Sequence, residues 1–493
     1  MSSGINVLAC DIGGGSGRIL NVEYRPDRLD LSQVTRFRNG PIKVGQNLYW
    51  DILGIFRDIK EGLVKASCQG LKAVSLGIDT WGNDFVLLDK KGYVLENPHS
   101  YRDSRTEDIV RYVGSLIPDF ELYSHNGIQQ VRMNTMYQLV SLVRDRSYVF
   151  ENAHRFLFIP DLLTYFLTGE IYNEYTLATI SQLYNYGKQD WDRALMERLG
   201  IPAGLFPSII QPGARCGSIL PSVCSDLYIE SLPLITVGAH DTASAVVAVP
   251  EPEEHTVYIS SGTWSILGTE TCKPVINETA FKYNFSNEGG VGGKIRLLKN
   301  VMGMWIVQEV QRCFTNEGRK YTFEDLYLLA QAAEPFGPVI DPDDNCFYEP
   351  ADMPEVIRKY CMKTGQRIPA SDGEIVRTAL ESLAFKYRYV VEKLENLTGH
   401  SYSGIHIVGG GAQNKLLCQM TSDCCGCTVY AGPVEATALG NALTQLISLG
   451  ELSGLRDARS LIKKCFPPME FYPRDGEVWE EQYQAFLALT NLQ

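Results

Sequence analysis

The 493-residue sequence contains no apolar run of about 18 residues, the length that a membrane-spanning helix needs. Its start also lacks the basic segment and long apolar stretch of a secretory signal peptide. Positive charge is scarce, because 45 Lys and Arg stand against 58 Asp and Glu, a net charge of −13. These absences argue against a membrane protein and against binding to nucleic acid. An anionic substrate would need a locally basic or N–H-lined pocket.

Paired metal-binding cysteines are missing too. The 13 cysteines are scattered, and the lone CxxC of Cys424 and Cys427 has no second ligand pair at similar spacing. Apolar residues at helical spacing before Cys424 favour a buried structural cysteine. A chain of this kind without a secretion signal is expected to keep its thiols reduced, in the cytoplasm. Two disulfide pairings remain open: Cys68 with Cys224, and Cys346 with Cys361.

The glycine-rich segment 13–17 matches neither common nucleotide-binding motif. GxxxxGK[ST] occurs nowhere, and Arg18 stands where the dinucleotide fingerprint needs its last glycine. The segment joins two β-type runs, so it predicts a hairpin whose backbone N–H groups close around phosphate oxygens. Ser16 and Arg18 would add a hydroxyl and a charge, and Asp11 is placed to hold hydrated magnesium. A plain glycine-rich β-turn is the alternative.

A second polar segment follows the next predicted strand, at 71–78. It contains Trp81, which could cover the apolar face of a sugar, between Asp79 and Asp84, which could accept hydrogen bonds from hydroxyls. The alternative is a tryptophan in the core and two aspartates that cap turns. The polar cluster 101–106 is the start of a helix in its simplest interpretation.

An acidic residue also stands at a predicted strand-to-helix junction in the middle of the chain. Asp241 follows a strand at 233–238 and precedes a helix of small residues at 243–249. This position suits a general base, and it equally suits a helix N-cap. The Pro-rich, charged residues 251–254 then predict a domain boundary. Directly after them a second strand–turn–strand pattern begins, so two hairpins open two halves of the chain.

The last part of the chain offers further candidate ligands. Asn300 lies near the predicted start of a helix that carries Gln308, where it reaches a ligand or caps the helix. A long helix is predicted from Ser371, because Glu374 completes a capping box. The glycines at 409–411 follow a strand at 405–408. Their backbone would suit a flat adenine or ribose, or simply a tight turn.

Taken in order, these segments resemble the FGGY carbohydrate kinases of the actin–hexokinase–chaperone ATPase superfamily. The motifs that carry the resemblance lie between about residues 5 and 448: 77–82, 101–106, 240–245, 260–265, 298–303 and 408–414. The resemblance implies an α/β fold of two actin/ribonuclease-H-like domains with a nucleotide and sugar cleft between them. Residues 1–247 would bind the sugar and residues 248–493 the nucleotide. The sequence departs from the family pattern at Gly14 and Gly15, where Ala-Ser is expected, and at Asn83, where an apolar residue is expected.

The resemblance also implies a reaction and a set of site residues. The reaction is ATP- and Mg²⁺-dependent phosphorylation of a ketose in rhamnose catabolism, with Asp241 taking the proton of the L-rhamnulose C1 hydroxyl. L-Fuculose or a pentulose is an alternative substrate, and a non-catalytic sugar sensor or actin-like protein is an alternative function. The protein would be a monomer or homodimer with no nucleic-acid partner. The residues expected to bind the ATP phosphates are Gly14, Gly15, Ser16, Gly17, Arg18 and Thr263, with Gln308 and Gly411 toward the rest of the nucleotide. Those expected to bind the sugar are Gly82, His240, Asp241, Thr242 and Asn300.

Overall fold

The computed structural model describes residues 4–250, 256–348 and 350–492, so the boundary predicted at 251–254 lies outside the described residues. Two compact units are interleaved along the sequence. Unit 1 comprises Met1–Ala248, Glu270–Leu297 and Ala436–Cys465. Unit 2 comprises Val249–Thr269, Leu298–Glu435 and Phe466–Gln493.

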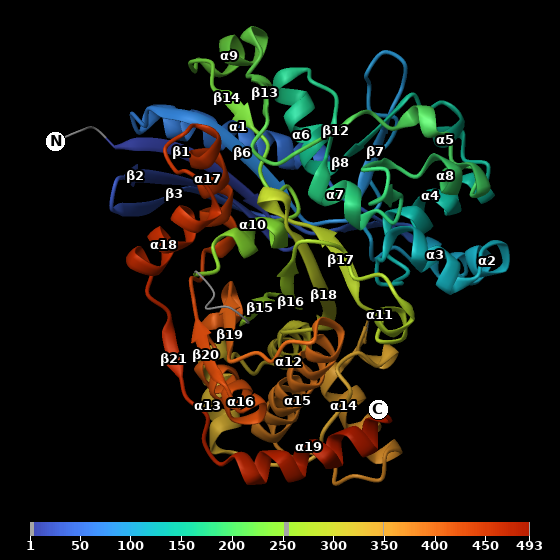
Figure 1. The fold of residues 1–493 in the computed structure, drawn as a ribbon, viewed down its shortest axis with the longest axis vertical. Helices are drawn as coiled ribbons and strands as arrows, with labels where there is room; N and C mark the ends of the chain where they lie inside the picture. Colours follow the sequence, from blue (N-terminus) through green and yellow to red (C-terminus); the bar gives the residue numbers. More distant parts are fainter. Residues whose placement is uncertain (1–3, 251–255, 349, 493) are drawn as a thin grey trace. The chain divides into compact units, whose positions relative to one another are not determined.

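Unit 1 is built on a mixed six-stranded sheet of order β13-β14-β6-β1-β2-β3 (Figure 1). In that order the strands are Arg215–Ser218, Pro233–Ile235, Ala73–Thr80, Ile5–Ile12, Ser16–Arg25 and Arg28–Arg38. β1 pairs antiparallel with β2 and parallel with β6. The glycine segment therefore joins strand to strand, as predicted, and does not open a helix.

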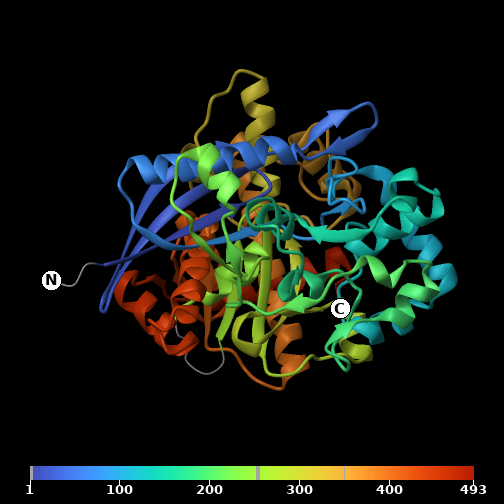
Figure 2. The ribbon, with the colours of Figure 1, turned by 90° about the horizontal axis from the view of Figure 1, so that it is seen from above.

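Helices cover both faces of this sheet. α1 (Ile52–Cys68) and α6 (Ile159–Thr168) pack on one face, and α10 (Asp241–Val247) and α17 (Ala436–Ser448) on the other (Figure 2). α1 begins after Asp51, whose side chain caps the helix by accepting a hydrogen bond from the Gly54 N–H at 3.0 Å. Its apolar face, which includes Ile52, Ile55 and Ile59, is buried against the sheet.

A second layer of unit 1 has its own apolar core, which contains residues from Phe85 to Phe206. Its ladder pairs β7 (Phe85–Leu88) with β8 (Arg155–Phe158). Its helices are α2 (Ile109–Leu116), α3 (Asp119–Asn126), α4 (Thr135–Arg144), α5 (Tyr148–Glu151), α7 (Tyr175–Ile180) and α8 (Arg193–Arg198). The remaining elements of the unit are α9 (Pro221–Leu227), α11 (Glu278–Lys282), α18 (Leu455–Cys465) and the strands β4 (Ile42–Val44), β5 (Asn47–Tyr49), β9 (Asn173–Glu174), β10 (Tyr184–Asn185), β11 (Asp190–Trp191), β12 (Ile209–Ile210) and β17 (Ser286–Gly289).

Unit 2 repeats the topology of the first sheet. Its strands follow the order β18-β16-β15-β19-β20-β21, with bounds Ile295–Met302, Trp264–Thr271, Thr256–Ser261, Gly404–Val408, Thr428–Ala431 and Met469–Phe471. β15 pairs antiparallel with β16 and parallel with β19, as β1 does with β2 and β6. The last residues of β16 and the first of β18 belong to unit 1. The second hairpin is confirmed, and so is the duplicated pattern.

The helices of unit 2 are α12 (Trp305–Asn316), α13 (Phe323–Ala332), α14 (Met353–Lys363), α15 (Asp372–Thr398), α16 (Lys415–Cys425) and α19 (Gly476–Thr490). The predicted capping box is present at α15, where Ser371 and Glu374 bond each other's backbone N–H groups. Cys424 is buried in α16, and all thirteen cysteines are free, which settles both open disulfide pairings.

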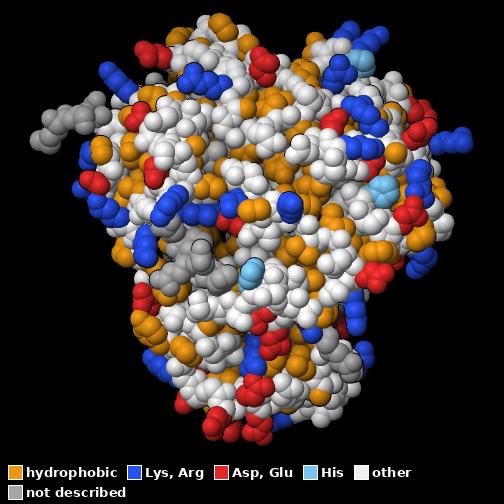
Figure 3. Space-filling model, in the orientation of Figure 1, with side chains coloured by type: hydrophobic (Ala, Val, Ile, Leu, Met, Phe, Trp, Pro, Cys, Tyr) orange, Lys and Arg blue, Asp and Glu red, His pale blue; other side chains and the backbone are white. Residues whose placement is uncertain are grey.

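Two further observations concern the distribution of charge and the length of the helices. On the face shown in Figure 3, Lys and Arg side chains are interspersed with acidic ones and do not gather over one element. Among the described residues, no helix is both long and apolar enough to cross a membrane.

Candidate active site

Two carboxylates meet at the ends of the parallel strands β1 and β6. Asp11 stands directly opposite Asp79 in the register, so Asp79 belongs to the strand end and not to the loop predicted there. Arg18, on β2, binds Asp11 through Nε and Nη2 at 3.0 and 2.7 Å. Asn441 of α17 donates to Asp79 Oδ2 at 2.6 Å, while Asp79 Oδ1 is buried without a hydrogen-bond partner. Burial, and then the charge of Asp11, raises the pKa of Asp79 well above its usual range.

Asp241 is the first residue of α10, and the N-cap position belongs to His240, whose side chain makes no capping bond. The cap interpretation of Asp241 is therefore wrong. Its Oδ1 accepts hydrogen bonds from Thr242 N and Oγ1 at 2.6 and 3.1 Å. Burial, and then the negative charge of Asp11, raises the pKa of Asp241 to about 7. A carboxyl with such a pKa is matched to proton transfer near neutral pH.

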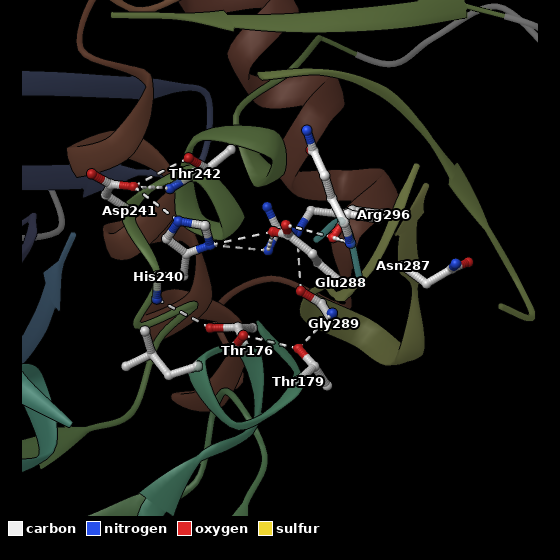
Figure 4. A network of polar contacts seen from close by, with 12 residues as sticks. Thr176, Thr179, His240, Asp241, Thr242, Asn287, Glu288, Gly289 and Arg296 are labelled. Carbon is white, nitrogen blue, oxygen red and sulfur yellow. Dashed lines mark hydrogen bonds and ion pairs between the residues drawn. The ribbon is translucent and has the colours of Figure 1, made fainter. Parts of the chain in front are cut away.

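His240 is surrounded by fixed groups (Figure 4). Its backbone N–H donates to Thr176 Oγ1 at 3.1 Å, and its Nε2 lies 3.6 Å from Asp241 Oδ1. On its other side lie the buried Glu288 and Arg296. Burial, and then the charge of Arg296, holds the pKa of His240 well below its usual value, so the ring is neutral. A Cβ on Gly82 would come within 3.3 Å of His240 Nε2 and still closer to a neighbouring isoleucine, which explains the glycine there.

The hairpin loop at 13–15 is held from outside by a residue that sequence reasoning missed. Asn39 Nδ2 donates to the Gly13 carbonyl at 2.8 Å, and the Asn39 N–H donates to the Gly15 carbonyl at 3.3 Å. No heavy atom lies within 4 Å of a Cβ built on Gly15, whereas one on Gly17 would collide with Phe37. Gly17 is thus required by packing, and Gly15 borders open space. Asn39 precedes Gly40, and Asn-Gly is a sequence signal for a turn, which could have drawn attention to this segment.

Trp81 and Asp84 form part of the core, so the proposed sugar-facing role of these two residues is wrong. The Trp81 ring packs on that of Trp50 at 4.0 Å between centroids. Both indole N–H groups donate to Asp84 Oδ2, at 2.9 and 2.6 Å, and the Tyr101 N–H joins them at 3.1 Å. Asn83 between them has φ of 72°, a backbone state that asparagine tolerates better than the apolar residues expected there. In the 101–106 cluster the cap is Asp103, which precedes a short 3₁₀ helix.

In unit 2, the structure brings together two of the predicted nucleotide residues. Thr263, in the turn of the second hairpin, donates from Oγ1 to Gln308 Oε1 of α12 at 3.4 Å. Gly411 lies against Ser261, whose side chain would occupy the place of a Cβ. Asn300 lies within β18, so it is not the helix cap that was the alternative.

The family models match both halves of the chain. The N-terminal domain model of the FGGY family of carbohydrate kinases matches residues 10–248, and the C-terminal domain model matches residues 257–449. The chain therefore belongs to the FGGY family of carbohydrate kinases, and it is an ATP-dependent carbohydrate kinase.

Among its relatives, the chain is similar to the rhamnulokinase of Bacteroides thetaiotaomicron, at 41% identity over 98% of each chain. It is also similar to the rhamnulokinase of Bacillus subtilis, at 37% identity over 95% of each chain. The fold resembles the crystal structures of a gluconate kinase and a xylulose kinase from Lactobacillus acidophilus. Their TM-scores are 0.81 and 0.79 at 16% identity, over 99% of this chain and 98% of each of theirs.

Proposed function

We propose that this kinase transfers the γ-phosphoryl group of ATP to the C1 hydroxyl of L-rhamnulose, giving L-rhamnulose 1-phosphate and ADP in rhamnose catabolism. The substrate is inferred from the rhamnulokinases to which nearly the whole chain is similar. The observation that carries the proposal is Asp241, a carboxyl whose pKa of about 7 suits a general base, beside the neutral His240.

In the proposed reaction, Asp241 accepts the proton of the C1 hydroxyl while that oxygen bonds to the γ-phosphorus. The bond from this phosphorus to the bridging oxygen breaks, and ADP leaves. Such transfers depend mainly on positioning and on compensation of charge. Gly82, His240, Thr242 and Asn300 are assigned to binding the sugar.

The nucleotide is assigned to the two hairpins and to unit 2. Its phosphates would lie at Gly14, Gly15, Ser16, Gly17, Arg18 and Thr263, and the rest of the nucleotide at Gln308 and Gly411. This corresponds to a sugar-binding half at 1–247 and a nucleotide-binding half at 248–493. The open space at Gly15, which is absent at Gly17, supports a ligand at the tip of the first hairpin.

The residues beside this hairpin fit a magnesium ion held through water. Asp11 supplies the carboxylate oxygen atoms that Mg²⁺ prefers, and Asp79 Oδ1, on the neighbouring strand, is buried without a hydrogen-bond partner. Among the described residues, no cluster of three or more His, Cys, Asp or Glu is placed to hold an ion directly. Asp11 is assigned to the hydrated ion, which when bound would offset negative charge on the phosphates. Arg18 holds the Asp11 carboxylate in place.

L-Fuculose or a pentulose remains the alternative substrate. A panel of ketoses with ATP and Mg²⁺, followed by release of ADP, tests the choice. The proposal predicts the highest kcat/KM for L-rhamnulose. A higher kcat/KM for another ketose would make that ketose the proposed substrate instead.

The thirteen free thiols support a reducing, cytoplasmic compartment. A monomer or homodimer is expected.

A further inference from the structure

A buried ion pair lies directly behind His240, and neither member was singled out from the sequence. Arg296, on the part of β18 that belongs to unit 1, is 0% exposed, and its Nη2 lies 3.1 Å from Glu288 Oε2 of β17. Its Nε donates to the Gly289 carbonyl at 3.0 Å. The same Nη2 lies 3.3 Å from His240 Nδ1 (Figure 4). The pair is therefore in position to fix the imidazole ring.

The chemistry of arginine decides which proton the ring carries. A guanidinium group only donates hydrogen bonds, so the His240 Nδ1 that faces it must accept with its lone pair. The single ring proton then resides on Nε2. Glu288 Oε2 is the competing partner, since it would favour a proton on Nδ1, but it lies farther away, at 3.6 Å, and faces Arg296. The charged groups that face the ring are thus Arg296, Glu288 and Asp241.

The Nε2 side of the ring faces the proposed base. Nε2 is 3.6 Å from Asp241 Oδ1, too far for a hydrogen bond between them but close enough for one hydroxyl group to reach both. Such a hydroxyl would accept a hydrogen bond from the Nε2–H group and donate its own proton to Asp241. With the other tautomer, Nε2 would compete with Asp241 for that proton.

We propose that Arg296 and Glu288 are positioning residues that hold His240 in its Nε2–H tautomer, so that it donates a hydrogen bond to the sugar hydroxyl beside Asp241. The inference rests on the proposed function for the identity of that hydroxyl. Arg296 Nη1 and Glu288 Oε2 are each buried without a hydrogen-bond partner, a cost that an ion pair optimised only for packing would not carry. A buried pair that holds a neighbouring ring accounts for this arrangement.

The tautomer is measured without substrate. The protein is labelled with ¹⁵N-histidine, and the His240 signals are identified by their loss in His240→Asn. Two-bond ¹⁵N–¹H correlations then report which ring nitrogen carries the proton. We expect Nε2–H in the wild type, unchanged between pH 6 and 8. An Nδ1–H ring in the wild type would overturn the proposal by itself.

The paired change Arg296→Met with Glu288→Gln removes both charges, because removing one partner alone leaves an uncompensated buried charge that threatens folding. We expect a mixture of His240 tautomers and a KM for the sugar that rises about tenfold or more, as for one lost hydrogen bond to a substrate. The KM for ATP should stay unchanged, and kcat should fall less than KM rises.

The matched control is Arg377→Met with Glu381→Gln, a second Arg–Glu pair, joined at 2.6 Å on α15 of unit 2, in which Glu381 is buried and Arg377 is 13% exposed. It should alter neither the His240 tautomer nor the KM for the sugar. An unaltered tautomer in the Arg296–Glu288 variant, or equal losses for sugar and ATP, would reduce the pair to a structural role. Absence of activity on every ketose with the wild type would instead refute the proposed function and leave the tautomer measurement intact.

Discussion

Replacing Asp241 by asparagine separates its chemical role from its structural one. Asparagine keeps an oxygen for the two hydrogen bonds from Thr242, at 2.6 and 3.1 Å, so α10 should begin as before. It cannot accept a proton, and a general base contributes a factor of about 10² to 10⁴. We therefore expect a folded Asp241→Asn enzyme that binds sugar and ATP with a kcat at least about a hundredfold lower.

The same change should stabilise the protein at alkaline pH. The pKa of Asp241 is about 7 in the folded state against an ordinary 3.8, so between these values the folded chain holds a proton that the unfolded chain has lost. The free energy of unfolding must therefore decrease as pH rises through this window. The full difference corresponds to about 4 kcal/mol. Because the side chain is 30% exposed, water reduces the penalty, and we expect about 1–2 kcal/mol.

The assay compares kcat, calorimetric binding of each substrate, and urea unfolding at pH 4 and pH 8 for wild type and Asp241→Asn. The control is Asp108→Asn, which removes a carboxylate that is 75% exposed and should match the wild type throughout. Asp241→Asn should gain stability at pH 8 and not at pH 4. A kcat within a few-fold of wild type would refute the assignment of Asp241 as the base, and equal stability at pH 8 would refute its raised pKa.

Three further predictions concern neighbouring groups. Gly15→Val should fold, because no heavy atom lies within 4 Å of the new Cβ. It should lower ATP affinity by about tenfold or more while sugar binding persists, and unchanged ATP affinity by calorimetry would exclude a phosphate at the hairpin. Asp11→Asn removes the second cause of the raised pKa of Asp241, so the acidic limb of kcat/KM should move to lower pH, and an unmoved limb would show that the two carboxylates do not interact. Asp84→Ala leaves two buried indole N–H groups unpaired, so it should lower the free energy of unfolding by about 2–4 kcal/mol. Urea titrations followed by tryptophan fluorescence measure this loss, and a loss below about 0.5 kcal/mol would show that these bonds contribute little.

The elements that sequence analysis predicted well are those coded by neighbouring residues. Both glycine hairpins and the capping box of α15 depend on residues within a few positions of one another, and all are confirmed. The runs and spacing of apolar residues predicted the strands that flank these hairpins.

The errors came from contacts between residues far apart in the sequence. Trp81 looked available for a sugar because its partner Trp50 lies about thirty residues earlier, and no local pattern joins them through Asp84. The contact of Glu288 and Arg296 with His240 could not be predicted for the same reason, because these residues lie about fifty positions from His240 in the sequence. The Asp241 cap was a local ambiguity, and the strand-to-helix geometry resolves it because His240 takes the cap position.

The central claim is that this kinase phosphorylates L-rhamnulose at C1. The most direct measurement is incubation of the purified protein with ATP, Mg²⁺ and ¹³C1-labelled L-rhamnulose, followed by ³¹P and ¹³C NMR of the product. We predict one sugar phosphate, with phosphorus coupling to the labelled C1 and one ADP formed per phosphorylated sugar. Phosphate on another carbon, or ADP formed without any sugar phosphate, would contradict the account.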